Sequence, residues 1–271
     1  MALVKLTPVE QRGDYWLKRD DLYEYAGVRG GKVRTCRVLC ERAVDAGVAG
    51  VVTAGSRHSP QVEIVAAVAA HLGLRCRAHV PAGAPTEQLE YAAQLGAELV
   101  AHRPGYNSVI VARAREDALA LGWHEVPFGM ECSEAVQATS GQVFNLPECE
   151  RVVVAIGSGM TAAGITVGMA AWWPELVPPM LGVVVGADPE RRLDRWAWPF
   201  WRGLLELRLA RESYGEHVAG ELEGVLLDEV YEAKVLPFLE PGDLLWVVGR
   251  RLDGRNEREV EGRVRAARGV E

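Results

Sequence analysis

A lysine placed directly after two glycines is the first candidate for chemistry in this chain. Lys32 follows Gly30 and Gly31 and opens a segment, residues 32–47, whose apolar residues recur with helical spacing. The start of a helix carries partial positive charge, which disfavours a charged lysine there and favours the free amine. A free amine is the nucleophile that forms a Schiff base with a carbonyl group. Taken alone, the segment fits an ordinary surface lysine better.

A second candidate is a glycine turn between a buried strand and a helix. The apolar run 151–156 leads into Gly157, Ser158, Gly159, Met160 and Thr161. Glycines let backbone N–H groups turn towards one point, and the helix start adds positive charge, so the turn suits a phosphate group. The turn has neither the Lys-Ser/Thr ending of a P-loop nor the spacing of a dinucleotide fingerprint. A tight turn with a packing role alone is the alternative.

A third turn, residues 56–61, follows another predicted strand. Ser59 and Gln61 bring a hydroxyl and an amide to the start of the next helix. Hydroxyls and free N–H groups at a helix start suit a carboxylate. A simple capping role for Ser59 explains the same pattern equally well.

Bulk composition narrows the class of protein. The chain has 271 residues, 49% hydrophobic and 25% charged, which is ordinary for one large globular domain or two small ones. A net charge of −7 argues against nucleic-acid binding as the main task, although a local basic groove would remain compatible with it. No apolar run reaches the roughly 20 residues that cross a bilayer, and residues 1–18 lack a signal-peptide pattern. We therefore expect a cytoplasmic protein with no membrane partner.

The five cysteines form neither a disulfide framework nor a metal site. They are odd in number and scattered, without a CxxC pair or a His/Cys cluster of ligand spacing. We expect no metal, and we expect these side chains to pack as small apolar groups in a reducing compartment. They are Cys36, Cys40, Cys76, Cys132 and Cys149.

The elements that must position the three turns alternate between strand and helix. Strands are predicted at residues 15–17, 50–55, 74–80, 98–101, 151–156, 181–186 and 244–248. Helices are predicted at residues 32–47, 62–72, 86–95 and 107–121. Thr86 would cap one helix start, and Gly73 and Gly122 would end two helices. This alternation predicts βαβ units, a mostly parallel sheet and therefore an α/β protein.

Two segments stand outside this alternation. Residues 191–211 hold Trp196, Trp198 and Trp201 among many arginines, and we predict an irregular aromatic layer over a core. A partner or substrate surface is the alternative, because exposed Trp and Arg often anchor interfaces. Residues 253–271 are strongly charged and are predicted to form a solvated, partly frayed helix.

Taken together, the motifs resemble those of a known family in the right chain order. The chain resembles the fold-type II enzymes that use pyridoxal 5′-phosphate (PLP), in the tryptophan synthase beta-like superfamily. Within them it is most similar to the branch of 1-aminocyclopropane-1-carboxylate (ACC) deaminase and D-cysteine desulfhydrase. The similar segments are an opening strand (residues 16–22), a Schiff-base segment (30–34), a Ser-Asn-(Gln/His)-like turn with its helix (59–73), a phosphate loop (157–164) and an Asp-Pro-Val-Tyr-x-x-Lys-like segment (228–234).

The resemblance implies an α/β fold in two lobes, each a mostly parallel sheet flanked by helices. Residues 1–40 and 141–271 would form a large cofactor domain, and residues 41–140 a small domain. The cofactor would lie in a cleft between the lobes, and the protein would be a homodimer.

The resemblance also implies roles for individual residues. Lys32 would form the Schiff base with PLP and then act as the base that moves a substrate proton. Residues 157–161 would bind the phosphate through backbone N–H groups and hydroxyls. Ser59 and Gln61 would meet the substrate carboxylate or assist proton transfer, and Tyr214 would be a second acid–base group.

Three departures from the family pattern bear on the reaction. Gly31 and Pro60 stand where the family has asparagines, and the chain is shorter between Tyr214 and Asp228. The acid facing the pyridine nitrogen therefore stays unassigned. The implied function is a PLP-dependent lyase or deaminase acting on a small amino acid. The alternatives are a PLP enzyme acting on an amino-acid group attached to a carrier, nucleotide or modified base, and an inactive relative that binds a ligand or partner.

Overall fold

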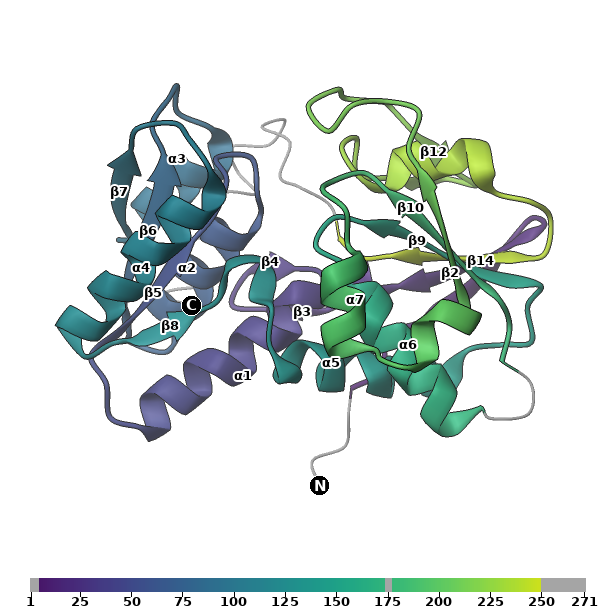
Figure 1. Cartoon of the computed structure of the whole chain (residues 1–271), viewed down its shortest axis with the longest axis horizontal. Coiled ribbons are helices and arrows are strands. Elements are labelled where there is room, and N and C mark those ends of the chain that lie inside the picture. Colours follow the sequence, from purple (N-terminus) through teal and green to yellow (C-terminus); the bar gives the residue numbers. More distant parts are fainter. Residues whose placement is uncertain (1–4, 174–176, 250–271) are drawn as a thin grey trace. The chain divides into compact units, whose positions relative to one another are not determined.

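The chain forms two compact units that are interleaved along the sequence. The computed structural model describes residues 5–173 and 177–249. Among these, unit 1 contains residues 5–23 and 132–249, and unit 2 contains residues 24–131 (Figure 1). Unit 2 is therefore a continuous insertion between the two parts of unit 1. The domain boundaries that the sequence suggested after residues 40 and 140 stay a prediction.

Unit 1 is built on a six-stranded sheet in the order β1-β2-β14-β9-β10-β11. Only β1 runs antiparallel to its neighbour, and the other pairs are parallel. The N-terminal strands thus complete a sheet whose centre comes from the far end of the chain. The strands are β1 (Val9–Arg12), β2 (Tyr15–Arg19), β9 (Arg151–Ile156), β10 (Met180–Val184), β11 (Leu205–Leu209) and β14 (Asp243–Val247).

Both faces of this sheet are covered. Val152, Val154 and Ile156 of β9 pack into the cluster formed with α5, α6 and α7. Val153 and Ala155 pack into the opposite cluster, with residues of η5 and of the β12–β13 hairpin. A strand buried on both sides must be apolar throughout, which explains why β9 lacks polar alternation. The covering elements are α5 (Ser133–Ser140), α6 (Met160–Trp172), α7 (Glu190–Trp196), β12 (Glu221–Leu222), β13 (Val225–Leu226) and η5 (Glu232–Phe238).

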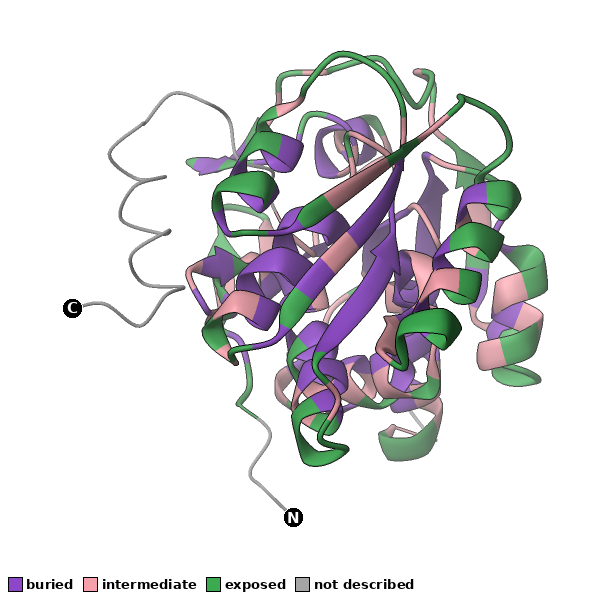
Figure 2. Cartoon of the chain, turned by 90° about the vertical axis from the view of Figure 1, so that its left-hand side faces the viewer, coloured by how far each residue is buried: buried purple, intermediate pink, exposed green. Residues whose placement is uncertain are grey.

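Unit 2 has a smaller sheet of four parallel strands, in the order β7-β6-β5-β8. Its central strand β5 is buried along its whole length, and the helices around it turn exposed faces outwards (Figure 2). The strands are β5 (Gly50–Ala54), β6 (Arg75–Pro81), β7 (Glu98–His102) and β8 (His124–Val126). The helices are α1 (Gly31–Asp45), α2 (Gln61–His71), α3 (Glu87–Gln94) and α4 (Asn107–Leu121).

Short elements complete both units. The hairpin β3–β4 (Glu24–Tyr25 and Val28–Arg29) opens unit 2. The 3-10 helices are η1 (Asp20–Leu22), η2 (Phe128–Met130), η3 (Gly141–Asn145) and η4 (Phe200–Gly203). None of the described helices is long and apolar enough to span a bilayer.

The predicted α/β class with mostly parallel sheets is confirmed, and one segment was predicted wrongly. Residues 191–211 are not an irregular layer, because they contain most of α7, η4 and the edge strand β11. Trp201 is buried in the core cluster, as a layer over a core requires, whereas Trp198 is 61% exposed. The predicted helix at residues 253–271 lies outside the described residues.

Two smaller predictions have mixed outcomes. Thr86 occupies the N-cap position of α3 but makes no capping bond. Its hydroxyl donates to the Arg57 carbonyl at 2.7 Å instead. The cysteines are all free, and Cys36, Cys40 and Cys76 are buried as predicted, while the other two are half-buried.

Candidate functional site

The glycine turn of unit 1 leaves a cluster of backbone donors unused. It links β9 to α6, and the first turn of an α-helix has no internal acceptors for its N–H groups. In the described part of the chain, no group accepts a hydrogen bond from the N–H groups of residues 158–161. Gly159 has φ +87°, a left-handed conformation that glycine adopts without a steric penalty. The turn therefore presents several donors at the positive end of a 13-residue helix.

Gly157 is required by the close approach of a tyrosine ring. A Cβ at this position would lie 2.7 Å from Cε1 of Tyr231, well inside van der Waals contact. Met160, by contrast, turns its side chain into the core cluster with only 4% exposed, so its backbone alone faces the turn. The ring of Tyr231 thus packs directly against the glycine turn.

Two tyrosine hydroxyls meet beside the turn. The hydroxyl oxygens of Tyr214 and Tyr231 are 3.2 Å apart, and either can donate. Their rings are nearly perpendicular, with centroids 6.0 Å apart. Tyr214 is 39% exposed, so this pair is open to solvent on one side. The structure therefore brings the predicted acid–base residue to the same unit as the predicted phosphate loop.

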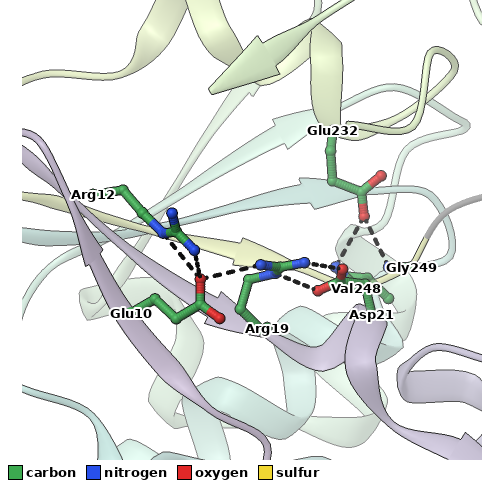
Figure 3. A network of polar contacts seen from close by, with 7 residues as sticks. All are labelled: Glu10, Arg12, Arg19, Asp21, Glu232, Val248 and Gly249. Atoms are coloured by element: carbon green, nitrogen blue, oxygen red, sulfur yellow. Dashed lines mark hydrogen bonds and ion pairs between the residues drawn. The ribbon is translucent and has the colours of Figure 1, made fainter. Parts of the chain in front are cut away.

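Glu232 is a buried acid next to Tyr231. Its Oε1 accepts hydrogen bonds from the N–H groups of Val248 (3.0 Å) and Gly249 (3.4 Å), while its Oε2 is buried without a partner (Figure 3). Burial, together with the nearby charge of Asp228, raises the pKa of Glu232 to about 8. A buried carboxyl oxygen without a partner is rare in proteins and marks a place where a ligand group is expected.

These groups gather at one edge of the sheet. Gly157 follows β9, and Val248 follows β14, its parallel neighbour. At the same ends of the strands, Arg19 of β2 forms an ion pair with Asp21 at 2.8 Å and with Glu10 at 3.2 Å (Figure 3). Ligands of open α/β sheets bind outside the carboxyl ends of the parallel strands, which is where this edge lies.

Lys32 is found in unit 2, at the second residue of α1. The helix begins at Gly31, as the double glycine predicted, and the lysine side chain is half-buried. Lys32 and the glycine turn therefore belong to different units, and its Schiff-base role stays a prediction.

The turn at residues 56–61 has internal hydrogen bonds that the sequence did not anticipate. Gln61 is buried, and its Nε2 donates to Thr53 Oγ1 (3.0 Å), the Ala54 carbonyl (3.3 Å) and the Pro127 carbonyl (2.8 Å). Ser59 Oγ accepts from the Gln61 N–H at 3.3 Å, although Pro60 and not Ser59 occupies the N-cap position of α2. Gln61 thus braces the ends of β5 and β8. The substrate roles of both residues stay predictions.

Unit 1 fits the polar ends of PLP. The unused N–H groups at α6 suit a phosphate, and the unpaired oxygen of Glu232 suits a ring nitrogen that carries or accepts a proton. Among the described residues, no group of three His, Cys, Asp or Glu side chains is arranged to hold a metal ion.

The chain belongs to the family of pyridoxal-phosphate-dependent enzymes, whose family model matches residues 2–199. The predicted cofactor, PLP, follows from this membership. Within the family, the chain is 29% identical to the D-cysteine desulfhydrase of Klebsiella pneumoniae over 84% of its own length and 81% of the relative's. It is 27% identical to the ACC deaminase of Burkholderia vietnamiensis, over 82% and 78% of the two lengths. A solved ACC deaminase homologue has the same fold, with a TM-score of 0.77 at 22% identity over 90% of this chain and 89% of the homologue.

Sequence reasoning missed Tyr231 and Glu232 as site residues. Both lie in segment 228–234, which served only to support the family resemblance. The partners that make Glu232 conspicuous, Val248 and Gly249, are 16 and 17 residues away along the chain. A usable signal was present nevertheless, because Glu232 stands in a charged segment flanked on both sides by apolar residues, and charged residues are rarely fully buried unless paired.

Proposed function

We propose that this chain is a PLP-dependent lyase or deaminase acting on a small free amino acid, with Lys32 as the lysine that binds the cofactor. Family membership and the unused donors at α6 are the observations that carry the proposal. The similarity to a D-cysteine desulfhydrase and an ACC deaminase suggests a substrate of that size. The proposal includes a homodimer and a cytoplasmic location, which size measurements and cell fractionation test.

Each candidate residue has a distinct task in this proposal. The N–H groups of residues 158–161 and the hydroxyls of Ser158 and Thr161 bind the phosphate. Glu232 Oε2 bonds the pyridine nitrogen and so fixes the orientation of the ring. PLP, when bound, supplies an electron sink for the carbanion formed at the substrate.

The remaining groups move protons. The Lys32 amine, which would hold the cofactor, would also serve as the base that removes a proton from the substrate carbon. The Tyr214 hydroxyl, held 3.2 Å from that of Tyr231, gives or takes a second proton, because each hydroxyl can pass a proton to its neighbour. Ser59 meets the substrate carboxylate.

An absorption spectrum with added PLP tests the proposal. We expect the wild-type protein to keep a band near the visible edge after dialysis, and Lys32→Ala to lose it. Lys5→Ala is the matched control, because Lys5 is an exposed lysine. Ammonia release is then measured with D-cysteine, ACC and other small amino acids. A wild type without the band would leave only the reading of an inactive relative, and turnover of large adducts alone would favour the alternative substrate class.

A further inference from the structure

Tyr214 lies in a segment with little regular structure of its own. Between the end of β11 at Leu209 and the start of β12 at Glu221, the described chain forms no helix or strand. The backbone is tied to the sheet at Ala210, whose N–H donates to the Val184 carbonyl, and to the following turn at Val218, whose N–H donates to the Glu229 carbonyl. Residues 211–217, which include Tyr214, are mostly exposed, so the position of this segment depends on side-chain contacts.

Lys234 supplies such a contact. Its Nζ donates to the carbonyl of Ser213 at 2.6 Å and lies 3.4 Å from the carbonyl of Tyr214. The side chain is fully buried, at 0% exposed. A buried ammonium is costly unless it is hydrogen-bonded, and bonds from a charged donor are strong, so the ammonium holds the Ser213 carbonyl firmly.

Residues at the start of η5 therefore contact Tyr214 at two points, its side-chain hydroxyl and its backbone carbonyl. Tyr231, which directly precedes η5, meets the Tyr214 hydroxyl, and Lys234, three residues further on, meets its backbone. The N–H of Lys234 donates to the Tyr231 carbonyl at 3.2 Å, so a single turn of chain links the two residues. Tyr231 is itself fixed against Gly157 and by its N–H, which donates to Asp228 Oδ1 at 3.0 Å.

We propose that Lys234 is the positioning residue for Tyr214: its ammonium holds the backbone of residues 213–214 so that the Tyr214 hydroxyl stays in reach of Tyr231. The assignment of a catalytic proton transfer to Tyr214 rests on the proposed function. The positioning itself is a property of the protein without ligand and is measurable there.

Fluorine NMR of the protein labelled with 3-fluorotyrosine provides the test. The chain has seven tyrosines, and Tyr214→Phe identifies the line of Tyr214. In Lys234→Met, which keeps the length of the side chain and removes its donors, we expect this line to move at least halfway to its position in the unfolded protein. The lines of tyrosines in unit 2 stay in place.

Lys18→Met is the matched control. Lys18 is also a fully buried lysine of unit 1, and it donates to the Thr7 carbonyl and to Asn145. Its removal should lower stability while leaving the Tyr214 line where it is. An unchanged Tyr214 line in folded Lys234→Met, or an equal movement in Lys18→Met, would overturn the proposal. If Lys234→Met does not fold, Lys234→Gln takes its place, because its shorter amide cannot hold both carbonyls, and the same outcomes decide.

Turnover adds a second readout. We expect Lys234→Met to lower kcat about 100-fold with little change in KM, the loss typical of a displaced acid–base group. In the Tyr214→Phe background the same substitution should cost almost nothing, since both changes act through one hydroxyl. Additive losses would contradict a role through Tyr214. A failure of the proposed function is recognised separately, because the PLP band would then be absent or independent of Lys32 while the NMR result stands.

Discussion

The turn after β9 in unit 1 and the turn after β5 in unit 2 have the same layout. In both, a buried strand ends, a glycine follows at once and a helix begins a few residues later. Gly157 and Gly55 even share their reason for being glycine, since a Cβ at either would lie 2.7 Å from a neighbouring side chain, Tyr231 or Val62.

The two turns differ in where their polar groups go. In unit 2 the Ser59 N–H donates to the Ser56 carbonyl, the Gln61 N–H donates to Ser59 Oγ, and the Gln61 amide braces two strands. In unit 1 the corresponding N–H groups have no partner in the described chain. The same layout therefore serves as a brace in unit 2, whereas in unit 1 it leaves free the N–H groups that we propose bind the phosphate. The unused donors, rather than the glycines, distinguish the two turns.

Substitution of the two glycines, Gly157 and Gly55, should reveal the largest difference between the two turns. Gly157→Val would displace Tyr231 and reshape the turn, so we expect PLP affinity to fall about 1,000-fold, or about 4 kcal/mol. Gly55→Val, which clashes with Val62 instead, should lower stability but leave PLP affinity nearly unchanged. Titration of each folded variant with PLP, followed by absorbance, measures both. Equal losses of affinity would mean that the turn of unit 1 has no special role.

The buried acid of unit 1, Glu232, should make the stability of the protein depend on pH. Because the pKa of Glu232 is raised from 4.5 to about 8, the folded protein keeps a proton that the unfolded chain releases between these values. Stability of the protein without PLP should therefore fall by about 5 kcal/mol as pH rises from 4.5 to 8, and should level off above pH 8. In Glu232→Gln this loss should disappear.

Urea unfolding at a series of pH values checks this prediction. Glu229→Gln is the control, because Glu229 is a half-exposed acid of the same segment. A wild-type slope that persists in Glu232→Gln would show that another group causes it.

Removing the brace of unit 2 should have the smallest effect, and should lower stability without lowering PLP affinity. Gln61→Leu leaves the carbonyls of Ala54 and Pro127 without their donor, so we expect a loss of about 2 kcal/mol. Ser59→Ala removes one hydrogen bond at the start of α2 and should cost about 1 kcal/mol. Thermal unfolding measures both changes. A loss of PLP affinity in Gln61→Leu as large as that in Gly157→Val would show that this turn also serves to bind the cofactor.

Much of the fold was predictable because local signals decided it. β9 is bounded by Gly157 and is apolar after its first residue, Arg151, and it was predicted to the residue. The helix α4 ends where Gly122 adopts φ +64°, as its position suggested. Strand β11 was not predicted, although Leu205, Leu207 and Leu209 alternate with charged residues, because a five-residue strand at the edge of a sheet carries only a short pattern.

The site was less predictable because its key contacts are distant in sequence. The glycine turn and Lys32 could be proposed from neighbouring residues alone. The brace made by Gln61 depends on Pro127, 66 residues further on, and the anchor made by Lys234 depends on Ser213, 21 residues back. Thr86 shows the same limit, since its hydroxyl bonds the carbonyl of Arg57, 29 residues away, in place of its own helix. Local pattern gives a residue's position in its element, whereas its bonding partner depends on the tertiary fold.

The interleaving of the two units has a consequence for biosynthesis. Strand β2 pairs with β14, and the indole N–H of Trp246 donates to Asp20, 226 residues earlier. During synthesis on the ribosome, all four strands of the parallel sheet of unit 2 are present once Val126 has emerged. The hairpin of β1 and β2 can join its sheet only after nearly the whole remaining chain has been made, because its partner is β14. The first strands to be translated are therefore among the last to find their place, and the inserted unit is the first part of the nascent protein able to fold.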